Sequence, residues 1–371
     1  MKIAMIGHKR IPSREGGVEI VVGELSKRMA ALGNTVVAYN RKSKHIANKK
    51  IEKLNEWEGV RIKWIPTPNS SKLNAIVYSF FAALRAVFSR FDVIHFHAEG
   101  PASMVILAKL FRKRSVVTIH GLDWQRSKWG GFATKYLMFG EKAAAKYADE
   151  IIVLSKNVQQ YFLDTYGRET VYIPNGISAP EIKGAGIIKE KFGLGKDDYI
   201  LFLGRLVPEK CVHLLIEAFK DIKTDKKLVI AGGASHTSEY EADIRELAKD
   251  NENIIFTGFV EGNELDELFS NAYIYCLPSD LEGMPISLLE AMSYGNCCLT
   301  SDIPECTEVL GEYGVSFRKS DKEDLKAVLE KLLENSESVQ HYKDNAQRYI
   351  LEKYNWDDVC QRTLALYGSA K

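Results

Sequence analysis

Long apolar stretches are missing from the sequence. The longest largely apolar stretch, Ala75–Leu84, spans ten residues and is closed by Arg85. A helix that crosses a bilayer needs about 20 such residues, so we expect no membrane span. The short run Ile3–Gly7 is followed at once by polar residues, which makes it too short for a signal-peptide core. We interpret it as a first strand and expect a cytoplasmic protein.

Cysteine motifs are also missing. The six cysteines form no CxxC pair and lack the histidine spacing of a zinc site; they lie at positions 211, 276, 297, 298, 306 and 360. Chains of this length seldom need a disulfide framework. We therefore expect buried free thiols in a reducing compartment.

An excess of one charge is missing from the chain as a whole, which has 50 Lys and Arg against 49 Asp and Glu. The two halves differ, because residues 1–180 hold 28 basic and 14 acidic side chains, whereas residues 181–371 hold 22 and 35. The neutral total argues against a nucleic-acid partner. The basic first half nevertheless predicts that an anionic partner of another kind binds there. Hydrophobic residues at 46% and aromatics at 10% are typical of a globular protein.

Short β-branched runs alternate with longer amphipathic segments along the chain, including helical patterns at Val18–Leu32, Asn74–Ser89 and Phe132–Ala148. Strands that are buried on both faces read as continuous apolar runs, and this is typical of parallel sheets covered by helices. The predicted strands are Lys2–Gly7, Thr35–Asn40, Val60–Pro66, Asp92–His97, Ser115–His120, Glu150–Ser155, Thr170–Pro174, Tyr199–Gly204, Lys227–Ala231, Ile254–Gly258, Tyr273–Leu277 and Cys297–Thr300.

Glycines and prolines gather at Asn175–Gly186, which indicates a linker. We therefore predict an α/β protein with two Rossmann-like domains, at residues 1–178 and 184–354, whose parallel sheets face each other across a cleft. Ligands on such sheets bind at the carboxyl ends of strands, so the residues that follow strands are the candidates for chemistry.

Paired glycines follow the first predicted strand. Gly16 and Gly17 open the helical pattern Val18–Leu32. Glycines let backbone N–H groups approach an anion, and a helix N-terminus favours negative charge. The pair predicts a phosphate loop or, alternatively, a tight turn between strand and helix. A GxGxxG dinucleotide fingerprint is absent.

Two cations follow the first strand of the second half. Arg205 and Lys210 lie six and eleven residues after Tyr199, where that strand begins. A planar guanidinium fork and an ammonium point charge suit a diphosphate. The alternative is a pair of solvated loop cations.

Two glutamates frame a turn in Glu282-Gly283-Met284-Pro285, with Glu290 following in a predicted helix. Pro285 suits a first helical turn, whose amides have no partner within the helix. Eight residues are about two helical turns, so we expect Glu282 and Glu290 on a similar face. Carboxylates there would accept hydrogen bonds from the vicinal hydroxyls of a sugar and a ribose; the alternative for each is a surface charge.

His120 ends a predicted strand before Gly121. A histidine there would donate to a sugar hydroxyl or to a leaving phosphate, or it has a structural role. For His95 and His97, which lie in the neighbouring strand, we predict a structural role.

Taken together, these motifs resemble glycosyltransferase family 4, the retaining GT-B enzymes that use nucleotide sugars. The resemblance covers the whole chain. Its elements are Gly16-Gly17-x-Glu19, Thr118-x-His120-Gly121, Ile173-Pro174-Asn175-Gly176, Gly204-Arg205-x-x-x-x-Lys210 and Glu282-Gly-Met-Pro…Glu290.

The resemblance implies a role for each candidate. Arg205 and Lys210 would bind the donor diphosphate, with the Gly17 amide touching it from the other domain. Glu282, beside Gly283 and Met284, would hold the donor sugar, and Glu290 the ribose. His120 would contact the sugar near the reacting carbon, and Asn175 would lie near the cleft floor. The C-terminal helix, at residues 355–371, would return to the N-terminal domain.

The same resemblance implies transfer of a sugar, a UDP-hexose first among the donors, with retained anomeric configuration. Pro285 departs from the Gly of many relatives and removes one amide donor. Asp197-Asp198 and Asp357-Asp358 do not lie in loops that suit a metal, so we expect no metal and no cofactor, with Arg205 and Lys210 supplying the positive charge.

The basic first half suggests the acceptor. Lysines and arginines cluster there, and Leu73–Phe91 is either an interfacial helix or a core helix. Basic clusters attract anionic lipid, so we expect a lipid-diphosphate-linked saccharide acceptor, a possible peripheral site at the inner face of the membrane, and a role in building a surface polysaccharide of the capsule or O-antigen type. The alternatives are a nucleotide-sugar 2-epimerase and a non-catalytic sugar-binding protein.

Overall fold

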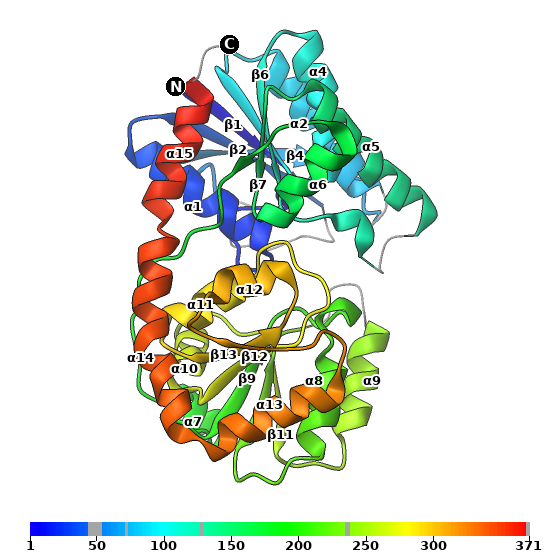
Figure 1. Ribbon diagram of the computed structural model, residues 1–371. Coiled ribbons are helices and arrows are strands. Elements are labelled where there is room, and N and C mark those ends of the chain that lie inside the picture. Colours follow the sequence, from blue (N-terminus) through cyan, green and yellow to red (C-terminus); the bar gives the residue numbers. More distant parts are fainter. Residues whose placement is uncertain (44–53, 71–72, 127–129, 234–237, 369–371) are drawn as a thin grey trace. The chain divides into compact units, whose positions relative to one another are not determined.

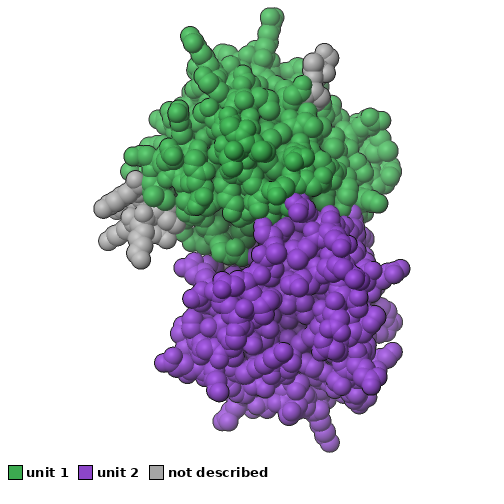
Figure 2. All heavy atoms as spheres, turned by 90° about the vertical axis from the view of Figure 1, so that its left-hand side faces the viewer, with its two compact units in different colours: residues 1–176, 356–371 green, residues 177–355 purple. Residues whose placement is uncertain are grey.

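The computed structural model describes residues 1–43, 54–70, 73–126, 130–233 and 238–368. The chain divides into two compact units (Figure 2), the first formed by Met1–Gly176 with Trp356–Lys371 and the second by Ile177–Asn355. Each unit is a sheet with helices on both faces (Figure 1), parallel throughout in the second unit and parallel except for one pair in the first, as the continuous apolar runs predict.

In the first unit the described residues form a sheet of eight strands in the order β3-β4-β2-β1-β5-β6-β7-β8. Every pair is parallel except β3 with β4. The strands are β1 (Lys2–Ile6), β2 (Thr35–Lys42), β3 (Glu56–Trp57), β4 (Val60–Pro66), β5 (Val93–His97), β6 (Arg114–Ile119), β7 (Glu150–Val153) and β8 (Val171–Tyr172).

The helices of this unit cover the sheet on both sides. They are α1 (Gly17–Ala31), α2 (Asn74–Val87), α3 (Glu99–Ala102), α4 (Val105–Leu110), α5 (Gly131–Tyr147), α6 (Lys156–Tyr166) and α15 (Trp356–Gly368), with a 3-10 turn, η2 (Asp123–Gln125). Alternate residues of β1 point to opposite faces. Ala4 and Ile6 therefore join one core with the alanines of α2, such as Ala82 and Ala86.

Helix α15, from the far end of the chain, belongs to the first unit and packs against α1. The Arg28 guanidinium lies 5.8 Å from the Trp356 ring centroid and 3.0 Å from Asp357. A Cβ atom on Gly176 would lie 2.7 Å from the Trp356 Cα. Only glycine therefore allows the chain to leave the unit this close to the point where it returns.

In the second unit the described residues form a parallel sheet of six strands in the order β11-β10-β9-β12-β13-β14. The elements are α7 (Ile187–Phe192), β9 (Tyr199–Leu203), η3 (Pro208–Lys210), α8 (Val212–Lys220), β10 (Lys227–Ala231), α9 (Ser238–Ala248), β11 (Ile254–Gly258), α10 (Asn263–Asn271), β12 (Ile274–Leu277), α11 (Ile286–Ser293), β13 (Cys297–Ser301), α12 (Pro304–Leu310), β14 (Val315–Phe317), α13 (Lys322–Glu334) and α14 (Ser336–Lys353).

Both sheets reverse their strand order once. The reversal lies between β1 and β5 in the first unit and between β9 and β12 in the second. Open α/β sheets bind ligands outside the carboxyl ends of strands at such a reversal. In this protein, these points lie beside His8 and His97 in one unit and beside Gly204 and Leu277 in the other.

All six cysteines are buried and unpaired, which confirms the expectation of free thiols. None of the helices in the described ranges is both long and apolar enough to span a bilayer.

Candidate functional site

The candidate donor residues of the second unit gather at its strand reversal. Lys210 ends the short turn η3 after β9, and Glu282 precedes α11 after β12. The Lys210 ammonium donates a hydrogen bond to Glu282 Oε1, and the two side chains are only 10% and 7% exposed. In a buried ion pair of this kind, the attraction between the two charges offsets the cost of removing them from water. The structure thus brings together two residues that lie 72 positions apart in sequence.

The expected helical relation between the two glutamates is wrong. Helix α11 begins at Ile286, with Pro285 as the residue just before it, at φ −74° and ψ 108°. Glu282 therefore lies in the preceding loop, whereas Glu290 is half-buried in the helix. Pro285 accepts at its carbonyl from the Leu288 amide, at 3.1 Å. The loop conformation, rather than a shared helix face, sets the position of Glu282.

Gly283 and Met284 are buried in this loop, and Arg205 is half-buried directly after Gly204. The end of β9 is fixed by its neighbour, because a Cβ atom on Gly232 would lie 1.8 Å from the Gly204 carbonyl oxygen. Gly232 also has φ +140°, a conformation that favours glycine. The backbone that carries Arg205 is thus held tightly against the end of β10.

In the first unit, Gly16 and Gly17 begin α1. The nearby Glu19 carboxylate is buried and accepts a hydrogen bond from the Lys9 amide at 2.8 Å. A Cβ atom on Gly16 would lie 2.3 Å from Glu19 Oε2. The structure therefore places a carboxylate at the helix N-terminus, where negative charge is stabilised, and Glu19 fixes the loop that leads into it.

His120 follows β6 and belongs to a group of histidines at the carboxyl edge of the sheet. Its Nε2 lies 3.1 Å from Nδ1 of His97, at the end of β5. Burial lowers the pKa of His120 to about 4 and that of His97 well below its ordinary value. Both rings are therefore neutral at physiological pH.

His95 has the structural role that we predicted. It is fully buried, with Nδ1 2.6 Å from the Tyr367 hydroxyl and Nε2 2.7 Å from the Thr118 hydroxyl. It therefore joins β5 to α15. His97 is equally buried but contacts His120 instead, so its assignment as purely structural misses this contact. Asn175 is buried at the end of the first unit.

Sequence reasoning missed a pair of buried carboxyl groups. Glu99, which begins α3 just after β5, and Glu141 of α5 are fully buried. Glu141 accepts hydrogen bonds from Trp124 Nε1 at 2.9 Å and from the Tyr161 and Tyr166 hydroxyls. The only available signal was that Glu99 follows a predicted strand by two residues.

Part of the basic charge of the first half lies inside the unit rather than on its surface. Arg10 is 7% exposed and pairs with Glu15; Arg126 pairs with Asp123 at 2.7 Å. The Arg41 guanidinium stacks on the Tyr78 ring at 4.7 Å. The sequence count of charges therefore overstates the positive surface. Six further lysines in that count, at positions 44, 49, 50, 53, 72 and 128, lie outside the described residues.

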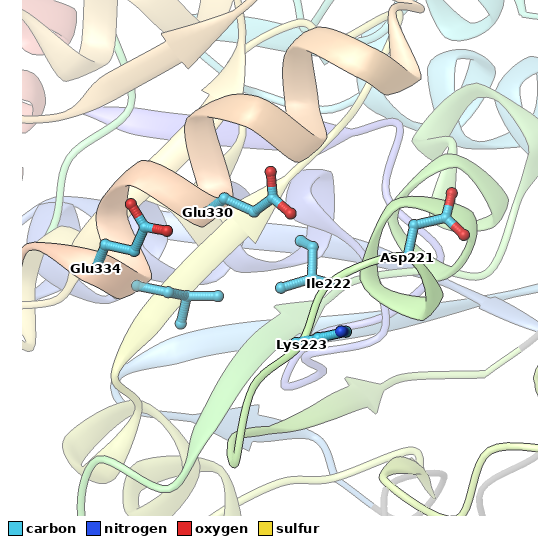
Figure 3. A pocket seen from close by; sticks show the side chains of 6 residues that line it. Asp221, Ile222, Lys223, Glu330 and Glu334 are labelled. Atoms are coloured by element: carbon cyan, nitrogen blue, oxygen red, sulfur yellow. The ribbon is translucent and has the colours of Figure 1, made fainter.

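A pocket of about 250 Å³ in the second unit lies away from these residues, between the end of α8 and α13 (Figure 3). It contains none of the predicted site residues; its lining is Asp221, Ile222, Lys223, Glu330, Leu333 and Glu334. Within the described ranges, no three His, Cys, Asp or Glu side chains are grouped so that they would hold a metal ion.

Two family models match the chain. The model for glycosyltransferase family 4 matches residues 15–179, and the model for glycosyl transferases group 1 matches residues 186–349. Together they span more than four fifths of the sequence.

Among curated proteins, an uncharacterized glycosyltransferase of Methanocaldococcus jannaschii is 25% identical over all of this chain and 98% of its own length. A phosphatidyl-myo-inositol mannosyltransferase of Mycobacterium leprae is 26% identical over 95% of this chain and 92% of its own. A crystal structure of Anabaena HepE in complex with UDP and glucose superposes over the full length of both chains, with a TM-score of 0.83 at 16% identity. The chain therefore belongs to the family 4, group 1 glycosyltransferases and has their GT-B fold.

Proposed function

We propose that this glycosyltransferase moves a hexose from UDP-hexose to a saccharide on a lipid carrier, with retention of the anomeric configuration and without a metal, in the assembly of a surface polysaccharide. The observation that carries the donor assignment is the buried Lys210–Glu282 pair at the strand reversal of the second unit. A cation for phosphate and a carboxylate for hydroxyls lie in direct contact there, which is the chemistry that a nucleotide sugar requires.

In this proposal the bond from the sugar C1 to the diphosphate oxygen breaks, and a bond from C1 to the acceptor oxygen forms. Arg205 and Lys210 stabilise the negative charge that grows on the diphosphate, and the Gly16-Gly17 amides add to this. The departing phosphate oxygen takes the acceptor's proton. Glu282 holds sugar hydroxyls beside Gly283 and Met284, Glu290 holds the ribose, and His120 contacts the sugar. Preorganised charge of this kind is the largest catalytic contribution in many enzymes.

Uridine as the base is supported by the Anabaena relative, which was crystallised with UDP and glucose. The test is a thermal-shift comparison of UDP, GDP, dTDP and ADP, followed by the corresponding nucleotide sugars. A ligand that binds only the folded state stabilises it by mass action. At a ligand concentration of 100 times Kd the free energy of unfolding rises by about 2.7 kcal/mol, and the melting temperature rises with it. A shift with GDP and none with UDP would exclude the uridine donor and leave the transferase assignment intact.

A lipid-linked acceptor is supported by a surface of the first unit. On α2 and α4, and at the residue that follows each of these helices, large apolar side chains are exposed: Phe80, Phe81, Phe88, Leu110 and Phe111. The Phe88 and Phe111 rings contact each other at 4.8 Å between centroids, which joins the two helices into one apolar surface. We name these five residues the aromatic patch.

Exposed cations accompany the aromatic patch in the sequence. Arg85, Arg90, Lys109 and Arg112 are exposed and lie within four positions of a patch residue in sequence, and neither α2 nor α4 contains an acidic residue. Helix α2 also contributes Ala82 and Ala86 to the core, so it serves as a core helix and presents the patch on its outer side. Exposed apolar side chains with basic residues around them suit the interface of an anionic bilayer. The mannosyltransferase relative, whose name specifies phosphatidyl-myo-inositol, is in keeping with such an acceptor.

A further inference from the structure

The hydrogen bond between His97 and His120 needs one donor and one acceptor, and the two neutral rings allow two arrangements. Either His97 Nδ1–H donates to His120 Nε2, or His120 Nε2–H donates to His97 Nδ1. The two arrangements place the remaining proton of His120 on different nitrogens. They therefore decide what His120 offers to a ligand.

The surroundings of His97 distinguish the two arrangements. Its side chain is fully buried, and no group in the described part of the chain contacts its Nε2 as a hydrogen-bond partner. If His120 were the donor, neutral His97 would carry its proton on Nε2, where it would be a buried N–H without an acceptor. Orphaned buried N–H groups are rarer than unused acceptors. The proton of His97 therefore lies on Nδ1.

His97 is also held in place. Its ring packs against the His95 ring, with centroids 4.0 Å apart and ring planes tilted by 31°, and His95 is fixed by Thr118 and Tyr367. A Cβ atom on Gly7 would lie 2.2 Å from the His97 carbonyl oxygen, so β1 presses directly against the end of β5. A donor with so little freedom defines the geometry of the group that accepts from it.

The groups around the pair keep it neutral. Burial is the main cause of the lowered pKa of both rings; His95, His120 and His8 lower that of His97 further. Asp123 and Glu19 raise the pKa of His120, but less than burial lowers it. His8 Nε2 lies 2.9 Å from Asn40 Oδ1. That oxygen is an acceptor, since it also accepts from the Ile11 amide, so His8 is the donor in this contact. No full charge therefore lies on this histidine group at neutral pH.

We propose that His97 is a positioning residue that donates from Nδ1 to His120 Nε2 and so fixes His120 as its Nδ1–H tautomer. The hydrogen bond of one imidazole nitrogen decides the protonation of the other. His120 then acts toward a ligand as a hydrogen-bond donor through Nδ1–H, suited to a sugar hydroxyl or a phosphate oxygen, and does not act as a base. The ligand part of this inference rests on the proposed function; the tautomer does not.

The tautomer is tested by NMR on protein labelled with ¹⁵N-histidine, without substrate. Wild-type His120 should show a protonated Nδ1 and an unprotonated Nε2. In His97→Leu the Nε2–H form should appear. In His97→Asn the side-chain amide provides a donor near the former Nδ1, so the Nδ1–H form should return. His213→Gln, a change at a histidine of α8 whose Nδ1 lies 2.9 Å from the Tyr240 hydroxyl and which does not belong to this histidine group, should leave the tautomer unchanged.

A protonated Nε2 in wild-type His120 would overturn the proposal, and so would an unchanged Nδ1–H tautomer in folded His97→Leu. Kinetics provide the second readout. With the true donor and acceptor, His97→Leu should lower kcat by roughly 10- to 100-fold, the value of one hydrogen bond to a charged group, without a matching rise in the donor KM, and His97→Asn should recover most of it. Full activity in His120→Ala would remove His120 from the proposed function while leaving the NMR result valid.

Discussion

The ammonium of Lys210 and the carboxylate of Glu282 form a buried ion pair. The two side chains proposed to bind opposite ends of the donor thus neutralise each other in this pair. Donor binding would replace one ion pair by two sets of contacts, lysine with phosphate and glutamate with hydroxyls. Both charges are removed from water when the protein folds, so donor binding does not have to desolvate them again. This is a form of preorganisation.

The first prediction concerns this pair. Lys210→Met leaves a buried carboxylate without its partner and should lower the free energy of unfolding by about 3 kcal/mol or more. Glu282→Gln should do the same for the ammonium. In the double variant neither charge remains, so its loss should fall short of the summed single losses by about 1–3 kcal/mol. Urea unfolding of the four proteins measures this, and additive losses would contradict a direct interaction.

A second prediction concerns Arg205. Removing one preorganised donor at a developing charge costs roughly 2.7–4 kcal/mol in other enzymes, so Arg205→Ala should slow turnover by about 100-fold or more. In the proposal, Arg205 and Lys210 neutralise the diphosphate without a metal ion. Removal of divalent ions with EDTA should therefore leave the turnover of the wild-type enzyme unchanged. Lys223→Ala, which removes an exposed cation of the same unit at the pocket in Figure 3, is the matched control. Full activity of Arg205→Ala, or a strict requirement for a divalent ion, would refute the assignment.

The third prediction uses two adjacent glycines. Gly232→Ala would bring Cβ to 1.8 Å from the Gly204 carbonyl oxygen, at φ +140°. The backbone before Arg205 must then shift, so both the melting temperature and UDP affinity should fall, the stability by about 1–3 kcal/mol. Gly233→Ala is the control, since no described atom lies within 4 Å of its added Cβ. Equal behaviour of the two variants would show that the Gly232 contact is unimportant.

The fourth prediction concerns Glu99. Burial, with the nearby Asp123 and Glu141 charges, raises the pKa of Glu99 well above its ordinary 4.5. The folded state therefore keeps a proton that the unfolded chain loses above about pH 4.5, and the free energy of unfolding falls as pH rises from there. Glutamine is neutral throughout. Glu99→Gln should thus be more stable than wild type at pH 8, by a margin that grows by up to about 1.4 kcal/mol per pH unit.

Glu141→Gln is the contrasting variant. Because Glu141 accepts from Trp124, Tyr161 and Tyr166, exchanging one carboxylate oxygen for an amide N–H should destabilise the protein at the same pH. Thermal melts of the three proteins between pH 5 and 8 compare them. A Glu99→Gln variant that is less stable than wild type across this range would show that Glu99 is charged in the folded state.

The fifth prediction concerns the aromatic patch. Wild-type protein should float with liposomes that contain anionic lipid, and binding should weaken as salt rises. Phe88→Ser with Leu110→Ser removes the two most exposed members of the patch, at 69% and 72% exposure, and should abolish flotation. Phe132→Ser, at an equally exposed phenylalanine of α5, is the control. Absence of wild-type binding at physiological salt would count against a lipid-borne acceptor.

Much of the fold was predictable because buried parallel strands give continuous apolar runs. The expected strand Asp92–His97 is observed as Val93–His97, and Lys227–Ala231 is unchanged. The strands Glu56–Trp57 and Val315–Phe317 were not predicted, because two or three residues carry no pattern. The local sequence pattern also gave a wrong prediction at Glu282, which we expected to share a helix with Glu290 and which lies in a loop.

The contacts within the site could not be predicted for a different reason. Lys210 with Glu282, and His97 with His120, are pairs brought together by strand order, over 72 and 23 positions. Sequence motifs identified three of these residues as candidates but not their partners. Pairing at a strand reversal depends on which strands are neighbours, and apolar patterning leaves that order open.

The first unit is assembled from two separate segments of the chain, with the whole second unit inserted between Gly176 and Trp356. Its core therefore lacks Trp356 and Tyr367 until the last segment has been synthesised. The second unit, which is continuous, is able to complete its fold first, although it is encoded later. Until the last segment has been synthesised, the nascent chain should leave uncovered the surface of α1 and the side of β5 at His95, both of which α15 contacts in the folded protein.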